Sequence, residues 1–204
     1  MSTKITDSRS RSYPRRCRGS TMMEVLVSVF VLSIGVLGVA GLQVTAKRSN
    51  FEATQRATAA ALAQDIVERM RSNPEELGTY TNAGVGRTID GTSMPMVDCS
   101  TDCGPVTLAQ YDLYELEQAA NGVAEQAAGN NVGGLTLSTT CITGPDGGPG
   151  IYNIAIAWRG MTKLSNPATD ACGSGSGRYD TVGGTEVDVY RRILVMPVFI
   201  SETG

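Results

Sequence analysis

The feature that most constrains this chain is an uncharged apolar run near its N-terminus. Residues 25–42, VLVSVFVLSIGVLGVAGL, carry no charge. As a helix rising about 1.5 Å per residue, they are just long enough to cross roughly 30 Å of hydrocarbon. Residues 43–72 that follow are Ala-rich, contain no Gly or Pro, and end at Asn73-Pro74. We therefore expect one helix over about residues 20–72, with a membrane half at 25–42.

The second half of this helix is predicted to be amphipathic. Apolar side chains recur at helical spacing on one face, at Phe51, Ala59, Leu62, Ile66 and Met70. Charged side chains lie opposite them over much of the length, at Lys47, Glu52, Arg56, Glu68 and Arg71. The apolar stripe predicts packing against a head formed by residues 73–204.

Charge is distributed unevenly along the chain. Residues 1–19 hold six of the 17 basic residues and one of the 20 acidic residues, so this segment carries +5 and the remainder −8. The segment is too polar to fold, which is typical of a targeting leader. The positive-inside rule places it in the cytoplasm and everything after about Lys47 across the membrane. An acidic head also argues against a nucleic-acid binder.

The head is expected to be a small antiparallel sheet with Gly-rich loops. It contains 20 of the 24 glycines. A short helix is expected over about residues 107–121, starting with a capping box from Thr107 to Gln110. β-Branched or alternating segments predict strands over residues 135–142, 152–158 and 187–200. Packing this sheet on the long helix gives an α+β fold.

Five cysteines divide between the two parts of the chain. Cys17 lies in the leader, and the head contains an even number, at Cys99, Cys103, Cys141 and Cys172. In an exported domain these predict two disulfides, for which three pairings exist. We favour Cys141 with Cys172 and Cys99 with Cys103. A four-thiolate zinc site is the alternative, but no second closely spaced pair follows the first. We expect no metal and no cofactor.

The composition also bears on catalysis. The chain has no histidine, so Ser-His-Asp, Cys-His and His-ligated metal mechanisms are excluded. The acid pairs Glu115/Glu117 and Asp98/Asp102 are interpreted as solvated surface. A Gly-x-Gly pattern does not connect a strand to a helix, so no phosphate loop is predicted at Gly173, Gly175 and Gly177. We expect no enzyme.

The junction between the leader and the apolar run contains a lone acidic residue. Gly19-Ser20-Thr21-Met22-Met23 precedes Glu24, and a carboxylate at the margin of a membrane span is costly without a partner. Cleavage after Gly19 would create an α-amino group at Ser20, which is mostly cationic at neutral pH. That amine would lie one helical turn from Glu24, or within reach of Glu24 on a neighbouring chain.

This junction resembles that of the type IV pilins, whose precursors have a short basic leader, a Gly before the cleaved bond, Glu as fifth mature residue and an apolar helix. The resemblance implies cleavage by prepilin peptidase between Gly19 and Ser20, N-methylation of Ser20, and subunit docking through Glu24. Ser20 departs from the Phe usual at the first mature position. The segments EVLVSVFVLSIGVLGVAGLQ, LAQDIVERMRSNP, AQYDLYEL and IAWRG further resemble the PilV group of minor pilins, or pilus modification proteins.

The resemblance implies a minor pilin, a structural subunit of a type IV pilus or its priming complex, needed for assembly and serving adhesion or twitching motility. Its expected partners are prepilin peptidase, other minor pilins, the major pilin, the inner-membrane assembly machinery and membrane lipid. It would span the inner membrane once, with a cytoplasmic N-terminus and a periplasmic head, and then enter the pilus at the cell surface.

Two alternatives share parts of this pattern. A pseudopilin of a type II secretion system has the same junction and architecture. A soluble exported domain would instead arise by signal peptidase cleavage at the small-residue site Gly38-Val39-Ala40. Three regularly spaced glycines fit either the ordinary composition of a membrane span or close approach of a neighbouring helix, at Gly35, Gly38 and Gly41.

Overall fold

The computed structural model describes residues 19, 21–100, 103–165 and 170–201. The leader before Gly19, including Cys17, lies outside the described residues, as do Ser20 and Asp102. The chain divides into two compact units between Ala46 and Lys47. The elements are helices α1 (Met22–Ser72), α2 (Leu77–Thr81) and α3 (Pro105–Ala120), a 3-10 turn η1 (Pro74–Glu76), and strands β1 (Arg87–Ile89), β2 (Gln126–Ala127), β3 (Asn130–Asn131), β4 (Thr139–Thr143), β5 (Gly150–Arg159) and β6 (Arg191–Ile200).

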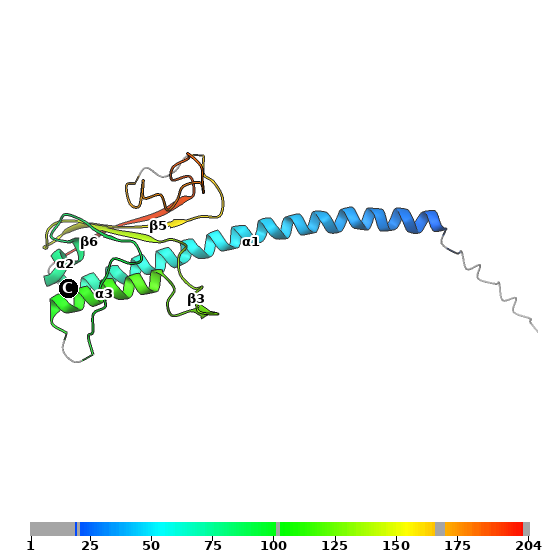
Figure 1. Cartoon of the computed structure of the whole chain (residues 1–204). Coiled ribbons are helices and arrows are strands. Elements are labelled where there is room, and N and C mark those ends of the chain that lie inside the picture. Colours follow the sequence, from blue (N-terminus) through cyan, green and yellow to red (C-terminus); the bar gives the residue numbers. More distant parts are fainter. Residues whose placement is uncertain (1–18, 20, 101–102, 166–169, 202–204) are drawn as a thin grey trace, which may run out of the picture. The chain divides into compact units, whose positions relative to one another are not determined.

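The long helix predicted from the sequence is confirmed as α1 (Figure 1). It ends at Ser72 because Pro74 lacks an N–H and disfavours helical geometry at the residue before it. Asn73 is buried, and its side-chain Nδ2 donates to the Pro105 carbonyl at 2.8 Å. The helix end is therefore bonded to the start of α3.

The head-facing stripe of α1 is largely as predicted. Its buried residues are Gln55, Ala59, Leu62, Ala63, Ile66, Val67 and Met70. Two expectations were wrong. Phe51, predicted to be core, is 39% exposed. Glu52, predicted to face solvent, is half-buried. Its carboxylate accepts a hydrogen bond from the Met161 N–H and pairs with Arg192.

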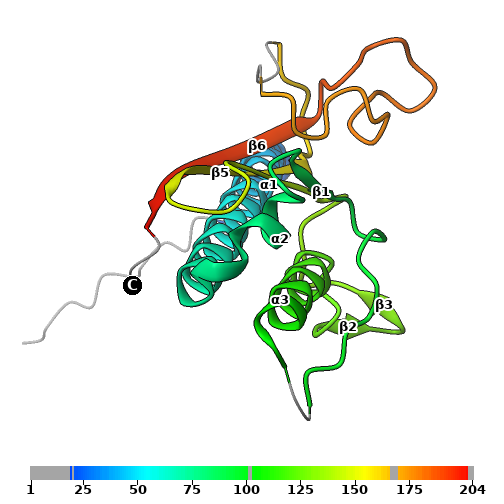
Figure 2. The same ribbon diagram turned by 90° about the vertical axis from the view of Figure 1, so that its left-hand side faces the viewer.

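The predicted antiparallel sheet is confirmed, with strand order β1-β4-β5-β6. Alternate residues of β5 are buried in the core with α1 and α3, at Tyr152, Ile154, Ile156 and Trp158. Figure 2 shows α1 and α3 on one side of the sheet and the loop over residues 170–190 on the other side. The disulfide between Cys141 on β4 and Cys172 attaches that loop to the sheet.

Two strands begin later than predicted. The strand expected from residue 135 begins at Thr139, because Leu137 has a positive φ of 49° and the Leu135 N–H donates to Ala120 instead. The strand expected from residue 187 begins at Arg191. There Asp188 has a φ of 57°, and its carbonyl accepts from the Arg191 N–H in a turn.

The predicted short helix is present, but its predicted start was wrong. It begins at Pro105 with Gly104 at the N-cap, and no side chain caps it. Proline suits the first helical turn because its missing N–H would have no partner there. Thr107 consequently lies inside the helix, so the capping box is not formed. The short elements α2, β1 and the β2–β3 hairpin were not predicted.

Candidate functional site

The predicted cleavage junction lies at the start of α1. Gly19 is exposed, and Thr21 precedes the first helical residue. The Glu24 N–H donates to Thr21 Oγ1 at 3.3 Å, so these residues occupy the N-cap and N3 positions. Glu24 therefore lies in the first turn, where a negative charge is favourable beside the helix N-terminus.

The Glu24 side chain is exposed. Within the described part of the chain, its carboxylate forms no hydrogen bond and no ion pair. The capping interaction uses the Glu24 backbone, and so does the Ser28 hydroxyl, which donates to the Glu24 carbonyl at 2.7 Å. The carboxylate itself is thus available to a group outside the described residues.

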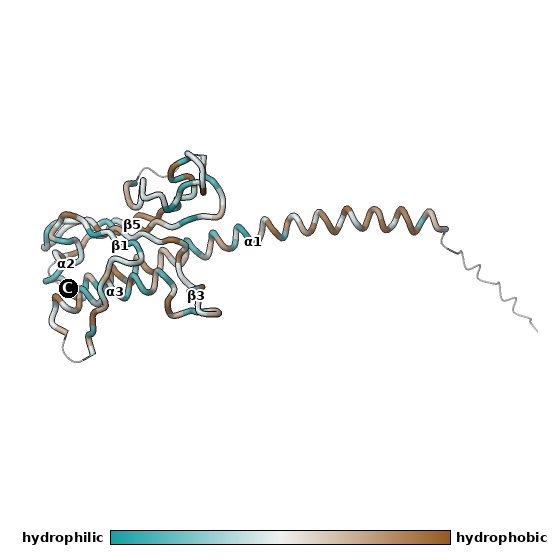
Figure 3. The backbone as a smooth tube through the Cα atoms, in the orientation of Figure 1, coloured by the Kyte–Doolittle hydropathy of each residue, from teal (hydrophilic) through white to brown (hydrophobic). Residues whose placement is uncertain are grey.

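The first half of α1 presents an apolar surface that no described residue covers. Every described residue from Met22 to Ala46 is exposed, and the apolar segment is seen in brown along the helix in Figure 3. This helix is long and apolar enough to cross a membrane, and none of its most apolar 18-residue window is buried. Ser33 is compatible with that environment because its hydroxyl donates to the Val29 carbonyl at 2.7 Å.

The three helix glycines are not required by contacts within the described chain. A Cβ added at Gly35, Gly38 or Gly41 would meet nothing within 4 Å. Any close packing at these positions therefore involves a group outside the described residues.

A polar cluster joins α1 to α3 within the head. Arg69 donates to Asp112 at 2.9 Å and to Glu115 at 2.7 Å. The buried Tyr80 hydroxyl donates to the other Asp112 oxygen at 2.5 Å. Burial acts to lower the pKa of the Arg69 guanidinium, but its hydrogen bonds to Asp112 and Glu115 outweigh burial and raise it. Burial raises the pKa of Tyr80, and the bond to Asp112 raises it further.

The acid pair Glu115/Glu117, considered for catalysis, does not act as a pair. Glu115 accepts from Tyr111 and Arg69, and the Tyr111 hydroxyl is the main cause of its lowered pKa. Glu117 is buried and accepts from the backbone of Ser93 at 2.8 Å. Both carboxylates thus hold the head together instead of lying freely solvated as predicted.

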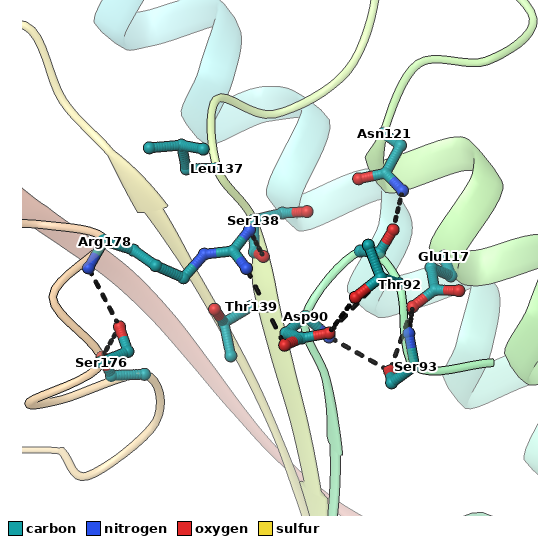
Figure 4. A network of polar contacts seen from close by, with 12 residues as sticks. Asp90, Thr92, Ser93, Glu117, Asn121, Leu137, Ser138, Thr139, Ser176 and Arg178 are labelled. Carbon is teal, nitrogen blue, oxygen red and sulfur yellow. Dashed lines mark hydrogen bonds and ion pairs between the residues drawn. The ribbon is translucent and has the colours of Figure 1, made fainter.

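Figure 4 shows the network around Glu117 and its continuation toward the 170–190 loop. Asp90 pairs with Arg178 at 3.9 Å, and Arg178 Nη2 donates to the Ser138 carbonyl at 3.2 Å. Gly175 belongs to that loop, and its N–H donates to Asp188. The Gly-x-Gly pattern is therefore part of a self-bonded surface loop, in agreement with the rejection of a phosphate loop.

Both disulfides of the favoured pairing are present, Cys141–Cys172 and Cys99–Cys103. Within the described ranges, no group of three His, Cys, Asp or Glu side chains could hold a metal ion.

The segment Trp158-Arg159-Gly160 does more than end a strand. Arg159 donates to the Arg178 carbonyl at 2.6 Å and to the Asp180 carbonyl at 2.9 Å, so it holds the 170–190 loop. A Cβ at Gly160 would lie 2.8 Å from Cζ of Arg192. Sequence reasoning assigned no function to these residues because their partners are distant in the chain.

Together these features define a class of protein. A long N-terminal helix with an uncovered apolar half, continued by a half that packs on a small antiparallel sheet, is the architecture of membrane-anchored, pilin-like proteins.

The family comparisons specify the class further. Residues 41–114 match the family model described as Type IV pilin Tt1218, and residues 14–40 match the prokaryotic N-terminal methylation motif. These matches support a subunit of a type IV pilus or pseudopilus, and type IV pilins are structural subunits. The motif implies processing by prepilin peptidase and assembly with other pilins. No curated protein and no solved structure matches the chain significantly.

Proposed function

We propose that this chain is a minor pilin of the PilV group, built into a type IV pilus or its priming complex. Residues 1–19 are the leader, residues 20–72 the helix with its membrane half at 25–42, and residues 73–204 the head. Prepilin peptidase cuts between Gly19 and Ser20, and the new terminus at Ser20 is N-methylated. The subunit then waits in the inner membrane with its N-terminus cytoplasmic and its head periplasmic.

The observation that carries the pilin and processing parts of this proposal is the position of the methylation-motif match, whereas the PilV subtype rests on the sequence resemblance alone. It covers residues 14–40, which include the end of the basic leader, the Gly19–Ser20 bond, Glu24 and most of the apolar run. The exposed apolar half of α1 supports the same proposal, because it needs an environment that the described residues do not provide.

Assembly follows from the chemistry of the junction. When α1 leaves lipid for a bundle of similar pilin helices, apolar contacts replace apolar contacts, so the hydrophobic energy changes little. An ion pair in that apolar setting stabilises the docked position of α1 relative to other positions of the helix in the bundle. The unpaired Glu24 carboxylate would form an ion pair with the N-terminal amine of a neighbouring subunit, such as the major pilin or another minor pilin.

The first test is the N-terminus and intact mass of protein recovered from membranes and from sheared surface fibres. A chain that starts at Ser20, with or without one methyl group, supports the proposal. A chain that starts at Gly41 would identify an exported soluble domain, and an uncleaved start would identify an ordinary membrane anchor. Either of these results refutes it.

A second test concerns docking. Glu24→Ala should still be cleaved, because the Gly19–Ser20 bond is unchanged, but it should be missing from sheared fibres. Ser33→Ala is the matched control on the same helix, since the Ser33 hydroxyl bonds only within its own turn. Normal incorporation of the Glu24 variant would contradict the docking role.

Deletion of the gene should impair twitching, whereas loss of protein secretion instead would identify a pseudopilin.

A further inference from the structure

A groove of about 430 Å³ with both polar and apolar walls lies within the head, between residues 49–56 of α1 and the start of β6. Its walls include Glu52, Arg56, Trp158, Thr162 and Arg192. Neither the polar clusters described above nor the proposed processing of the N-terminus uses this groove.

The acidic side chain of the groove is already committed. Glu52 accepts from the Met161 N–H at 2.6 Å and pairs with Arg192 Nε at 3.4 Å. Arg192 Nη2 donates to the Thr162 carbonyl at 2.8 Å, which holds the guanidinium against the turn after β5. Gly160 makes this arrangement possible, because a Cβ there would lie 2.9 Å from Oε1 of Glu52 and closer still to Arg192.

Two donors beside this pair lack acceptors. Trp158 Nε1 and Arg192 Nη1 are both buried, and neither has a hydrogen-bond partner in the described part of the chain. The Trp158 side chain is only 3% exposed. Leaving a buried donor unpaired costs about 1–3 kcal/mol. Because indole and guanidinium nitrogens only donate, the missing group is an acceptor.

The charges of the groove specify that acceptor. Arg56 is exposed on the same wall and forms no ion pair with any described residue. With Arg192 it gives two positive charges against the single negative charge of Glu52. A planar guanidinium binds carboxylate by paired hydrogen bonds, which are shorter and stronger than bonds between neutral groups. The groove therefore favours a carboxylate over a neutral carbonyl.

We propose that this groove binds a carboxylate side chain from the head of a neighbouring pilin subunit. The proposal rests on the proposed function, since only an assembled fibre or priming complex holds another head against this one. Acidic heads supply the required chemistry: this chain itself carries −8 after its leader. Because the exposed half of α1 offers mainly apolar contacts, a charged contact between heads would distinguish one neighbouring subunit from another.

The groove can be probed directly because Trp158 is the only tryptophan in the chain. Full-length protein in a neutral detergent is titrated with N-acetylglutamate amide, at constant ionic strength, while tryptophan emission is recorded. N-acetylglutamine amide is the uncharged control. We expect a saturable change in emission with the glutamate compound alone. No saturable change would show that the groove does not bind a carboxylate, and an equal change with the glutamine compound would show that it does not select one; either result would overturn the proposal.

Matched variants test the source of the binding. Arg56→Gln removes the unpaired charge without disturbing the Glu52–Arg192 pair, and it should weaken binding about tenfold, as expected for one lost charge-assisted bond. Arg71→Gln is the control, because Arg71 is exposed, pairs with Glu68 and lies outside the groove. Equal weakening by both variants would show a general charge effect and refute the assignment.

Fibres distinguish this proposal from the proposed function. In cells, Arg56→Gln should be cleaved as efficiently as the wild type but recovered from sheared fibres at a reduced level. Normal cleavage with normal incorporation would reject the groove as an assembly contact and leave the pilin assignment intact. Absence of cleavage in the wild-type chain would reject the pilin assignment itself.

Discussion

The two disulfides of the head should differ in how much they stabilise it, because they close loops of very different length. Cys141 and Cys172 are 31 residues apart, whereas Cys99 and Cys103 are 4 apart. A crosslink reduces the conformational entropy of the unfolded chain, and this effect grows with the logarithm of loop length. At 25 °C the loop-entropy relation gives about 3.7 kcal/mol for the long loop and about 1.9 kcal/mol for the short one.

The folded structure supports the same order. Cys172 is 5% exposed and attaches the 170–190 loop to the outer face of the sheet, whereas both residues of the short loop are half-buried. Replacing both members of a pair by alanine avoids placing a hydroxyl at the buried position. For a domain of this size, about 2–4 °C per kcal/mol gives melting temperatures lower by about 7–15 °C for Cys141→Ala/Cys172→Ala and about 4–8 °C for Cys99→Ala/Cys103→Ala.

The measurement is thermal and urea unfolding of the full-length protein in mild detergent, followed by emission of the buried Trp158. Wild-type protein under reducing conditions is the control, and its stability should approach that of a variant lacking both disulfides. Equal losses for the two pairs, or a larger loss for the short loop, would show that loop closure in the unfolded chain does not determine these contributions.

Three further predictions concern the head. The contacts of Glu115 lower its pKa below the ordinary value of 4.5. These contacts therefore stabilise the fold above that pH, and the stabilisation is lost as the pH falls through the folded-state pKa. Glu115→Gln should flatten the dependence of the urea midpoint on pH between about 3 and 6. Gln55 is 6% exposed, and its side-chain amide bonds the Gly134 carbonyl and the Thr136 N–H. Gln55→Ala should lower the free energy of unfolding in urea by about 2–4 kcal/mol. An unchanged midpoint would mean that water replaces the amide. Gly160→Ala should shift the emission of the single tryptophan, because its Cβ displaces the adjacent ion pair; an unaltered spectrum and stability would contradict the close approach.

Local signals were enough to predict the helix and the sheet. The apolar run, the absence of Gly and Pro in residues 43–72, and the proline at 74 each act within a few residues, so α1 could be predicted to end at Ser72. The alternation of large apolar residues in β5 likewise predicts the face packed on the helices, whereas the burial of Ala155 and Ala157 on the opposite face was not predicted. The predicted starts of β4 and β6 were wrong because Leu137 and Asp188 have positive φ angles, which residues other than glycine rarely adopt.

The candidate groove could not be predicted, because its parts are separated along the chain. Glu52 bonds the backbone N–H of Met161, 109 residues away. Nothing in the sequence near Glu52 distinguishes it from the charges of a solvated helix face. The only local signal was Trp158-Arg159-Gly160, where a glycine directly after a strand also has an ordinary interpretation as a turn. Only the fold shows that this glycine allows Arg192 to approach.

The two halves of α1 have different surroundings: the second half packs in the head, and the first half is exposed. The second half buries apolar residues within its own head, so its packing is fixed once the chain folds. The first half buries none of its most apolar window, so its stability depends on lipid or on other apolar helices. Exchange between those two environments costs little hydrophobic energy, because both are apolar. In the proposed function, polar groups therefore direct the exchange, and the candidates argued above are the Glu24 carboxylate and two donors of the groove, Trp158 Nε1 and Arg192 Nη1.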